Sequence, residues 1–141
     1  MIDVRILGRD DAQVLEQVAE GVFDGPIDPT AAKGYVEDPR LHLAVAIDDG
    51  TVVGMASGLH YHHPDKPVPE LWINEVGVAA SHQRRGLASR LLATLIEHGR
   101  SLGCGQAWVL TERDNQAAMA LYARSGGTSS DCVMFTFRSV L

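Results

Sequence analysis

The segment that most constrains the fold is one in which an apolar stretch passes through a short polar loop into a long amphipathic pattern. Residues 71–78 read LWINEVGV and are nearly all apolar, as expected of a central strand that is buried on both faces. Residues 85–102 carry leucine and isoleucine at helical spacing, which predicts a helix of about five turns. A buried strand that leads directly into an amphipathic helix is typical of an α/β domain.

The loop between this strand and this helix has the features of an anion site. A helix that begins here directs unpaired backbone N–H groups outward, and its dipole adds positive potential at the same end. Gly86 and Ala88 keep the surface low enough for a phosphate to reach the backbone, and Arg84 and Arg85 add positive charge. An alternative stays open, because a glycine pattern alone predicts function weakly. In that alternative the loop is a simple helix start with solvated arginines.

The segments before this junction predict helices and an antiparallel hairpin. Apolar residues at helical spacing after Asp10 predict a helix that ends before Gly25. Residues 48–50, DDG, form a turn that joins two β-compatible runs. The expected elements are a strand at 4–7, a helix spanning Val14 to Val22, a short helix at 29–38, strands at 41–47 and 51–59, and a loop at 60–67.

Three further elements are expected after the junction. They are a strand at 107–110, a helix at 115–124 that two glycines close, and a last strand at 133–140. The resulting order, βα(α)βββαβαβ, predicts an α/β fold with a mixed, twisted sheet flanked by helices, in which antiparallel strands come first and parallel crossovers later. A chain of 141 residues fits one domain, residues 1–141.

Charge and hydropathy exclude several classes of protein. The formal net charge of −6 argues against a protein that binds nucleic acid by general phosphate neutralisation. No apolar run approaches the ~18–20 residues of a membrane span, and Met1 to Arg5 do not begin a signal peptide, so we expect no membrane association and a cytoplasmic protein. Cys104 and Cys132 show no metal-ligand spacing and are expected to be reduced core thiols.

Two motifs resemble the Gcn5-related N-acetyltransferase (GNAT) superfamily. Residues 83–88, QRRGLA, resemble its Gln/Arg-x-x-Gly-x-Gly/Ala signature, and residues 115–126 resemble its Asn-x-x-Ala-x-x-Leu-Tyr-x-x-x-Gly helix. The expected order of elements is also that of the superfamily, and the resemblance covers roughly residues 41–138. The sequence departs from the pattern at Gly127, where an aromatic residue commonly follows the glycine.

The resemblance implies that the chain binds acetyl-coenzyme A. The turn would hold the pyrophosphate, while the preceding strand and the second motif would hold the pantetheine arm and the thioester. An N–H near Val78 would polarise the thioester and stabilise the oxyanion that forms during transfer. The implied cofactor-binding residues are Val76, Gly77, Val78, Gln83, Arg84, Arg85, Gly86, Leu87, Ala88, Ser89, Asn115, Ala118 and Tyr122.

Tyr122 and Glu75 are the candidate catalytic residues. The resemblance places Tyr122 beside the thioester sulfur, where a phenol can protonate the leaving thiolate; a tyrosine packed in the core is the alternative. Glu75 interrupts an apolar strand, which is costly unless the carboxylate is used or paired, and burial would strengthen it as a base. A solvent-facing or arginine-paired Glu75 stays open, as do Glu70 or an ordered water as the base.

A finer resemblance concerns the acceptor. Residues 70–78 and the closing VMFTF at 133–137 look like the aminoglycoside 3-N-acetyltransferase type I branch. This implies direct transfer, in a ternary complex, to a primary amine of a small molecule, and an acidic protein suits a polycationic amine through steering. Other small amines or a protein amine stay open. The candidate acceptor residues are Asn74, Glu112 and Asp131, and alternation predicts that Asn74 and Glu75 face opposite ways.

The remaining patterns are assigned structural roles first. His60, His62 and His63 have no cysteine or carboxylate partner at metal spacing, so we expect no metal and a loop that at most lines the acceptor pocket. Trp72 and Trp108 are expected in the core or in a cleft wall. The apolar run at 133–137 favours a homodimer that pairs through this strand. Two other classes compete, a non-catalytic acetyl-coenzyme A-binding module and a scaffold with purely structural glycines; Glu75 and Tyr122 together favour an enzyme.

Overall fold

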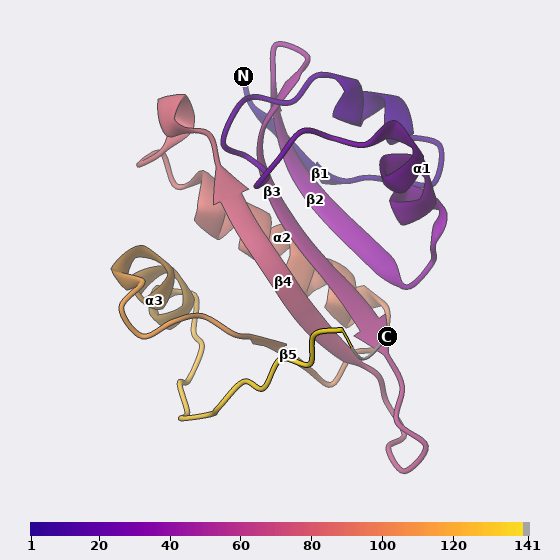
Figure 1. Ribbon diagram of the computed structural model, residues 1–141, viewed down its shortest axis with the longest axis vertical. Helices are drawn as coiled ribbons and strands as arrows, with labels where there is room; N and C mark the ends of the chain where they lie inside the picture. Colours follow the sequence, from indigo (N-terminus) through magenta and orange to yellow (C-terminus); the bar gives the residue numbers. More distant parts are fainter. Residues whose placement is uncertain (140–141) are drawn as a thin grey trace. The chain divides into compact units, whose positions relative to one another are not determined.

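A mixed five-stranded sheet forms the centre of the first part of the chain. The structure, a computed structural model, describes residues 1–139, and the chain divides into two compact units, Met1–Leu110 and Thr111–Leu141. The strands lie in the order β1-β2-β3-β4-β5 (Figure 1); β1 to β4 are antiparallel in succession, and β5 is parallel to β4. They are β1 (Asp3–Ile6), β2 (Leu41–Asp48), β3 (Thr51–Tyr61), β4 (Glu70–Val78) and β5 (Gln106–Val109).

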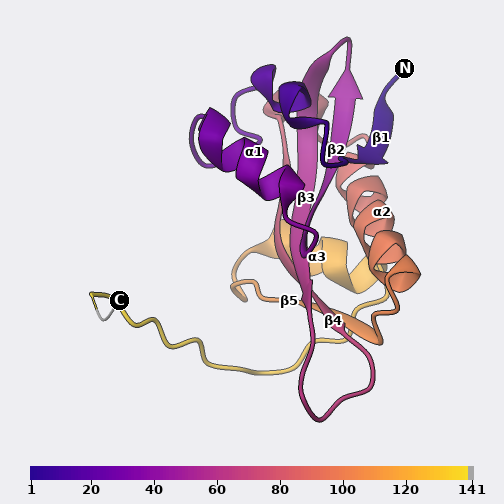
Figure 2. The ribbon, with the colours of Figure 1, turned by 90° about the vertical axis from the view of Figure 1, so that its right-hand side faces the viewer.

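Helices cover both faces of this sheet, as predicted for the fold class. Figure 2 shows α1 (Pro29–Glu37) on one face and α2 (Leu87–Ser101) on the other. Leu91 and Leu95 of α2, one helical turn apart, are fully buried on the sheet. Glycines in β3 allow this close approach, since a Cβ at Gly54 would lie 2.9 Å from Leu91 Cδ1. The strand predicted at 71–78 and the helix predicted at 85–102 are therefore confirmed as β4 and α2.

The predicted helix between Asp10 and Gly25 is wrong beyond its first turn. Only a 3-10 helix, η1 (Ala12–Glu16), forms, and the backbone is already extended at Gln17. Val18 then makes an isolated parallel bridge to Val52 of β3, with Ala19 N donating to Val52 O at 2.9 Å. Of the apolar residues that suggested a helical face, Leu15 is buried in η1 and Val22 beyond the segment that pairs with β3, while Val18 and Ala19 are half-buried in that segment.

The second unit contains one helix and no strand within its described residues. Helix α3 (Gln116–Arg124) confirms the helix predicted at 115–124. The strand predicted at 133–140 is wrong for residues 133–139, which pair with nothing and carry Val133, Met134, Phe135 and Phe137 at 74–80% exposure; Val140 lies outside the described residues. A strand needs a neighbouring backbone, which alternation in the sequence cannot supply. The homodimer expected through this segment stays a prediction.

Both cysteines are free thiols, but neither is in the core. Cys104 is half-buried and Cys132 is exposed, because the strand that would have buried Cys132 does not form. Burial raises the pKa of the Cys104 thiol. In the described part of the chain, no helix combines the length and the apolar character needed to cross a membrane.

Replacing Gly77 by alanine is expected to destabilise the first unit. A Cβ at Gly77 would lie 2.3 Å from the backbone oxygen of Val22, which belongs to the segment held on β3. Relieving this overlap requires backbone movement, so we expect Gly77→Ala to lower the free energy of unfolding by about 2 kcal/mol in urea titrations. Gly25→Ala is the matched control, because no atom lies within 4 Å of a Cβ there. Equal stabilities for the two variants would contradict this packing.

Three histidines form a hydrogen-bonded chain between the sheet and α2. His42 of β2 is 6% exposed, with Nε2 at 2.7 Å from His60 Nδ1 and Nδ1 at 3.1 Å from His98 Nε2. His60 was expected in a loop, but β3 extends to Tyr61 and includes it. Burial, followed by the charges of His98 and His60, lowers the pKa of His42 to about 4.

This histidine chain predicts a loss of stability in mild acid. In the unfolded chain His42 binds a proton near its ordinary pKa of about 6.5, whereas the folded protein resists protonation down to about pH 4. Stability conferred by the neutral ring is therefore complete above the unfolded pKa and falls as pH decreases. We expect the free energy of unfolding to drop by about 2 kcal/mol between pH 7 and pH 5. Urea titrations of His42→Gln should show a smaller drop, while the exposed His62→Gln should retain it; identical slopes for wild type and His42→Gln would contradict this assignment.

Candidate functional site

The end of β4 that leads into the loop has one open edge. The pairing of β4 with β5 ends at the Ile73–Val109 pair, whereas β4 continues to Val78. Over this last part, within residues 1–139, the ladder partners of β4 come only from β3. One side of the strand from Asn74 onward therefore has backbone groups that a ligand can use.

The hydrogen-bond pattern shows which backbone groups point to that open edge. Ala79 N donates to Val53 O at 2.9 Å, so Ala79 pairs with β3 by hydrogen bonds. Antiparallel pairs alternate between bonded and non-bonded, which directs the N–H and C=O groups of Val76 and Val78 away from β3. The Val78 carbonyl already accepts the Gln83 side-chain Nε2 at 3.1 Å. Both backbone groups of Val76 and the N–H of Val78 therefore face the open edge.

A break in the register of β4 decides where Glu75 points. Glu75 pairs with Ser57 but Ile73 pairs with Gly58, so Asn74 is an extra residue in β4. Ile73 faces α2, because its partner Gly58 would place a Cβ 3.4 Å from Leu95 Cδ2. After the extra residue the alternation is reversed, and Glu75 lies on the face opposite α2.

This reversal corrects two expectations about the strand. Glu75 is exposed rather than buried, so the expectation of a carboxylate buried in this strand is wrong. Asn74 is exposed as well, and the strict alternation that placed it opposite Glu75 does not hold at a register shift. Without the extra residue, Glu75 would face the apolar surface of α2; the shift is how a carboxylate is accommodated in this strand.

Tyr35 of α1 is hydrogen-bonded to β2 and β3 next to the register shift between β3 and β4. Its hydroxyl is 2.8 Å from His42 O and 3.2 Å from Gly58 O, at the step where the register changes. Burial, with a smaller contribution from the Glu75 carboxylate, raises the pKa of Tyr35 to about 12. The phenol is therefore a fixed hydrogen-bond donor that joins α1 to the sheet near Glu75.

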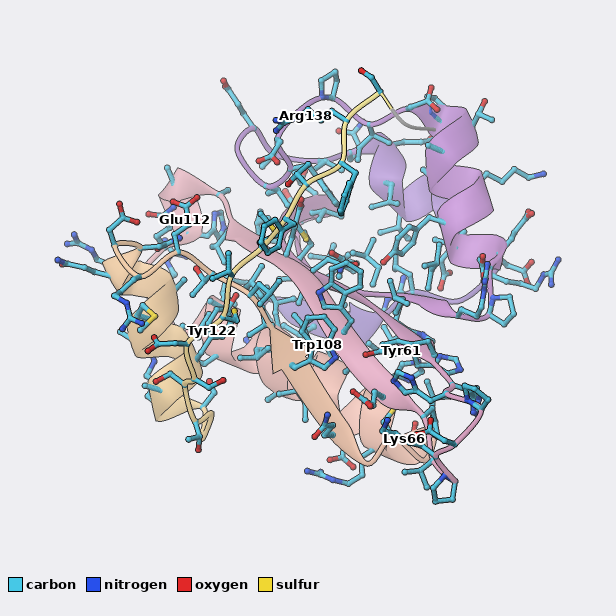
Figure 3. The ribbon with its side chains drawn as sticks, turned by 60° about the horizontal axis from the view of Figure 1, so that its bottom comes forward. Tyr61, Lys66, Trp108, Glu112, Tyr122 and Arg138 are labelled. Atoms are coloured by element: carbon cyan, nitrogen blue, oxygen red, sulfur yellow. The ribbon has the colours of Figure 1, made fainter. Side chains whose placement is uncertain are left out.

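Glu70, the alternative base, is held in a separate polar network. Its carboxylate is nearly buried, accepting from Gln106 Nε2 at 2.9 Å and from the Tyr61 hydroxyl at 3.3 Å. The indole Nε1 of Trp108 donates to the same hydroxyl at 2.7 Å, and Figure 3 shows Tyr61 and Trp108 pointing toward each other. The Gln106 hydrogen bond is the main cause that lowers the pKa of Glu70. A carboxylate so engaged is a weak proton acceptor, which favours a structural role.

Trp72 of β4 and Trp108 of β5 lie opposite each other on the two paired strands. Trp72 stacks on Trp108 with ring centroids 5.2 Å apart and planes 8° apart, and both rings are half-buried. Neither ring is a deep core residue or an isolated platform, so the place in the core is wrong and the cleft wall stays a prediction.

The loop after β4 has the geometry of an anion cradle. Arg84 and Gly86 have positive φ values of 63° and 76°, and Gly86 begins α2 without a side-chain cap. No acidic residue lies in the first turn of α2, so no carboxylate there competes with an anion for the leading N–H groups. Arg84 and Arg85 are exposed, Leu87 is buried and contributes only its backbone, and no atom lies within 4 Å of a Cβ at Gly86.

The second unit holds the other predicted residues. Asn115 caps α3, its Oδ1 accepting from Ala118 N at 3.1 Å, which leaves the amide Nδ2 as the group that can donate to a ligand. Tyr122 is half-buried, and burial raises its pKa. Glu112 is exposed, whereas Asp131 is paired with Arg113, so its charge is already compensated.

The structure thus gathers one group of predicted residues within the first unit. The register shift, the open edge of β4 and the start of α2 follow one another along the chain, and Gln83 ties the loop to the strand. Asn115, Ala118, Tyr122, Glu112 and Asp131 belong to the second unit. Sequence patterns missed three residues whose hydrogen bonds lie next to the loop and the strand: Tyr35, Asp48 and His82. A signal in the sequence existed only for His82, which directly precedes the QRRGLA motif.

The chain is similar to proteins of a known family. The profile described as Acetyltransferase (GNAT) family matches residues 12–127. N-alpha-acetyltransferase RimI of Mycobacterium tuberculosis (strain ATCC 25618 / H37Rv) is 32% identical over 127 residues, which are 89% of this chain and 77% of that protein. N-acetyltransferase 8 of Homo sapiens is 30% identical over 105 residues, 72% of this chain but only 46% of that protein.

Solved structures share the fold. An aminoglycoside acetyltransferase, meta-AAC0020 from an uncultured soil metagenomic sample, solved in complex with sisomicin, has a TM-score of 0.85 at 14% identity, covering 99% of this chain and 97% of that one. The aminoglycoside N-acetyltransferase AAC(6')-Iy, solved in complex with CoA, has a TM-score of 0.75 at 18% identity, covering 99% of this chain and 95% of that one. Identities this low show a common fold and carry no information on the acceptor.

Proposed function

Since the chain belongs to the acetyltransferase (GNAT) family and is an N-acetyltransferase that uses acetyl-coenzyme A, we propose that it transfers the acetyl group to a primary amine of a small cationic molecule. The observation that carries the proposal is that the open edge of β4 leads directly along the chain into the uncapped, basic start of α2. The family profile spans most of both units, which supports one acetyltransferase domain over residues 1–141.

The residues of the first unit fit acetyl-coenzyme A. The leading N–H groups of α2, with Arg84 and Arg85, suit a pyrophosphate, and the open space at Gly86 lets it approach. The Val76 backbone offers one donor and one acceptor, the arrangement that an amide-bearing arm can pair with like an added strand. When bound, acetyl-coenzyme A supplies an acetyl group activated as a thioester. In the proposed arrangement the Val78 N–H donates to the thioester oxygen as negative charge develops there.

Two side chains move the protons. The acceptor is an ammonium at neutral pH, so it must lose a first proton before its nitrogen attacks. As the nitrogen bonds to the acetyl carbon and the carbon–sulfur bond breaks, the nitrogen loses a further proton, which is released to water, and the sulfur must gain one. Glu75, exposed on the face opposite α2, accepts the first proton directly or through water. Tyr122 donates the proton that the sulfur gains: a phenol is protonated at neutral pH, and burial, which raises the pKa of Tyr122, keeps it so.

The acceptor is proposed from charge. The net charge of −6, against which Arg84 and Arg85 stand as a local exception, favours encounter with a cationic amine. Aminoglycosides are such molecules, and the residue pattern at 70–78 keeps 3-N acetylation as the finer proposal; the solved structures of like fold include a 6′-acetyltransferase. A second candidate is the N-terminal α-amine of a protein, which the similarity to RimI over most of the chain favours.

The test is thiol release from acetyl-coenzyme A with a panel of aminoglycosides, polyamines and short peptides with free N-termini. The proposal expects turnover with polycationic amines to exceed that with peptides, and mass spectrometry with NMR of the product then locates the acetyl group. Peptides as the better substrates would support the α-amine candidate instead. Tight binding of coenzyme A with no turnover on any amine would overturn the proposal.

A further inference from the structure

We propose that Asp48 and His82 are positioning residues that hold the Gln83–Gly86 loop in its anion-binding shape, so that they set the affinity for acetyl-coenzyme A without touching it. The inference rests on the proposed use of this loop for the pyrophosphate. It concerns two residues that no motif contains and that lie 34 positions apart in the chain.

Hydrogen-bond contacts connect the β2–β3 hairpin to the loop through the His82 ring. Asp48 Oδ2 lies 2.7 Å from His82 Nε2, and Ser81 Oγ lies 2.7 Å from His82 Nδ1, so both ring nitrogens are engaged. The His82 side chain is 15% exposed and that of Asp48 is 34% exposed, which limits competition from water. His82 ends the short helix η2 (Ala80–His82) and is followed directly by Gln83 and Arg84.

The loop requires such support because of its backbone conformation. Arg84 adopts a φ of 63°, which a residue with a side chain adopts only when its surroundings impose it. Two tethers precede Arg84: His82 to Asp48, and Gln83 Nε2 to Val78 O at 3.1 Å. The Gln83 contact fixes the loop to β4, and the His82 contact fixes it to β2. The two residues directly before Arg84 are therefore each bonded to a different strand.

Asp48 is a firm anchor for this purpose. It is the last residue of β2 and pairs with Thr51 across a two-residue turn. Asp49 and Gly50 have φ values of 49° and 78°, the conformation of a tight hairpin turn that matches the twist of the strands. The His82 hydrogen bond is the main cause that lowers the pKa of Asp48, so the carboxylate stays charged and the bond stays charge-assisted at neutral pH.

Whether removal of the Asp48 carboxylate weakens or strengthens ligand binding distinguishes a positioning role from a purely electrostatic one. Asp48 places a negative charge near Arg85, and their attraction also contributes to the lowered pKa of Asp48. If charge alone mattered, removing this carboxylate would strengthen binding of an anionic ligand at the loop. If Asp48 acts through His82, removing it loosens the loop and weakens binding, although the site becomes more positive.

The experiment compares ligands with and without the pyrophosphate. Asp48→Ala and His82→Phe are each expected to weaken coenzyme A binding, measured by calorimetry, about tenfold, the loss of one charge-assisted hydrogen bond. The KM for acetyl-coenzyme A should rise by the same factor with kcat within about twofold, while KM and kcat for acetyl-pantetheine, which lacks the pyrophosphate, stay at the wild-type values. The double variant should bind no more weakly than either single one.

Three further variants serve as controls for charge, for the His82 hydrogen bond and for the site of the pyrophosphate. Asp49→Asn removes a charge from the same turn at an exposed position and should leave coenzyme A affinity unchanged. His82→Gln, whose amide nitrogen can occupy the place of Nε2, should recover part of the affinity. Arg84→Ala should weaken coenzyme A binding but not acetyl-pantetheine turnover, which checks the loop as the pyrophosphate site.

Tighter or unchanged coenzyme A binding by Asp48→Ala, or an equal loss with both donors, would overturn the positioning role. Failure of the proposed function is distinct: wild type would then turn over neither donor with any amine, and the calorimetry would still decide the positioning role.

Discussion

Tyr122→Phe is expected to lower kcat about 100-fold while the KM for acetyl-coenzyme A stays within about twofold. The substitution removes only the hydroxyl, so the half-buried ring keeps its packing in the second unit. What is lost is the proton that the departing thiolate needs, and a thiolate released without a donor must take its proton from water. Steady-state kinetics with a saturating amine acceptor measure the effect.

The pH profile provides an independent check on this assignment. Burial raises the pKa of Tyr122 above its ordinary value near 10, so wild type should lose no activity through this group between pH 7 and pH 9. The matched control is Tyr61→Phe, which also removes a half-buried hydroxyl but one engaged by Trp108 and Glu70. Tyr61→Phe should lower stability and leave kcat near the wild-type value. Equal kcat values for Tyr122→Phe and wild type would remove the acid role and leave Tyr122 as a packing residue.

The parts of the fold that follow from local pattern were predictable. The apolar run of β4, the leucine spacing of α2 and the DDG turn of the hairpin each depend on residues close in sequence, and each appears where expected. The loop between β4 and α2 was predictable for the same reason, since a glycine with positive φ and an uncapped helix start are encoded within a few residues.

The parts that failed depend on distant partners. The apolar spacing after η1 fits a helix until Val18 meets β3, and the run at 133–137 fits a strand for which the structure provides no neighbour. The register shift at Asn74 is set by how β3 and β4 align. No pattern within β4 therefore predicts that Glu75 lies on the face opposite α2. The Asp48–His82 contact likewise joins the ends of two elements that only the sheet brings together.

Glu75→Gln is expected to lower kcat/KM for the amine acceptor about 100-fold at pH 7, with the KM for acetyl-coenzyme A little changed. The register shift makes this carboxylate available on the face opposite α2, and glutamine keeps its size while removing its ability to take a proton. An amine acceptor is largely protonated at pH 7, so without the base only the small unprotonated fraction in solution reacts. The defect should therefore shrink as pH rises, up to about tenfold per unit until the pKa of the amine is reached.

Glu70→Gln is the matched control on the same strand. Its amide can keep the hydrogen bonds from Gln106 and Tyr61, so activity should stay within about threefold of wild type at every pH, and any loss should appear in the free energy of unfolding instead. A Glu75→Gln defect that persists unchanged to pH 9.5 would mean that Glu75 binds or orients the acceptor rather than deprotonating it. The reverse pattern, with Glu70→Gln impaired at neutral pH and rescued at high pH, would move the base to the start of β4 and assign the register shift a purely structural role.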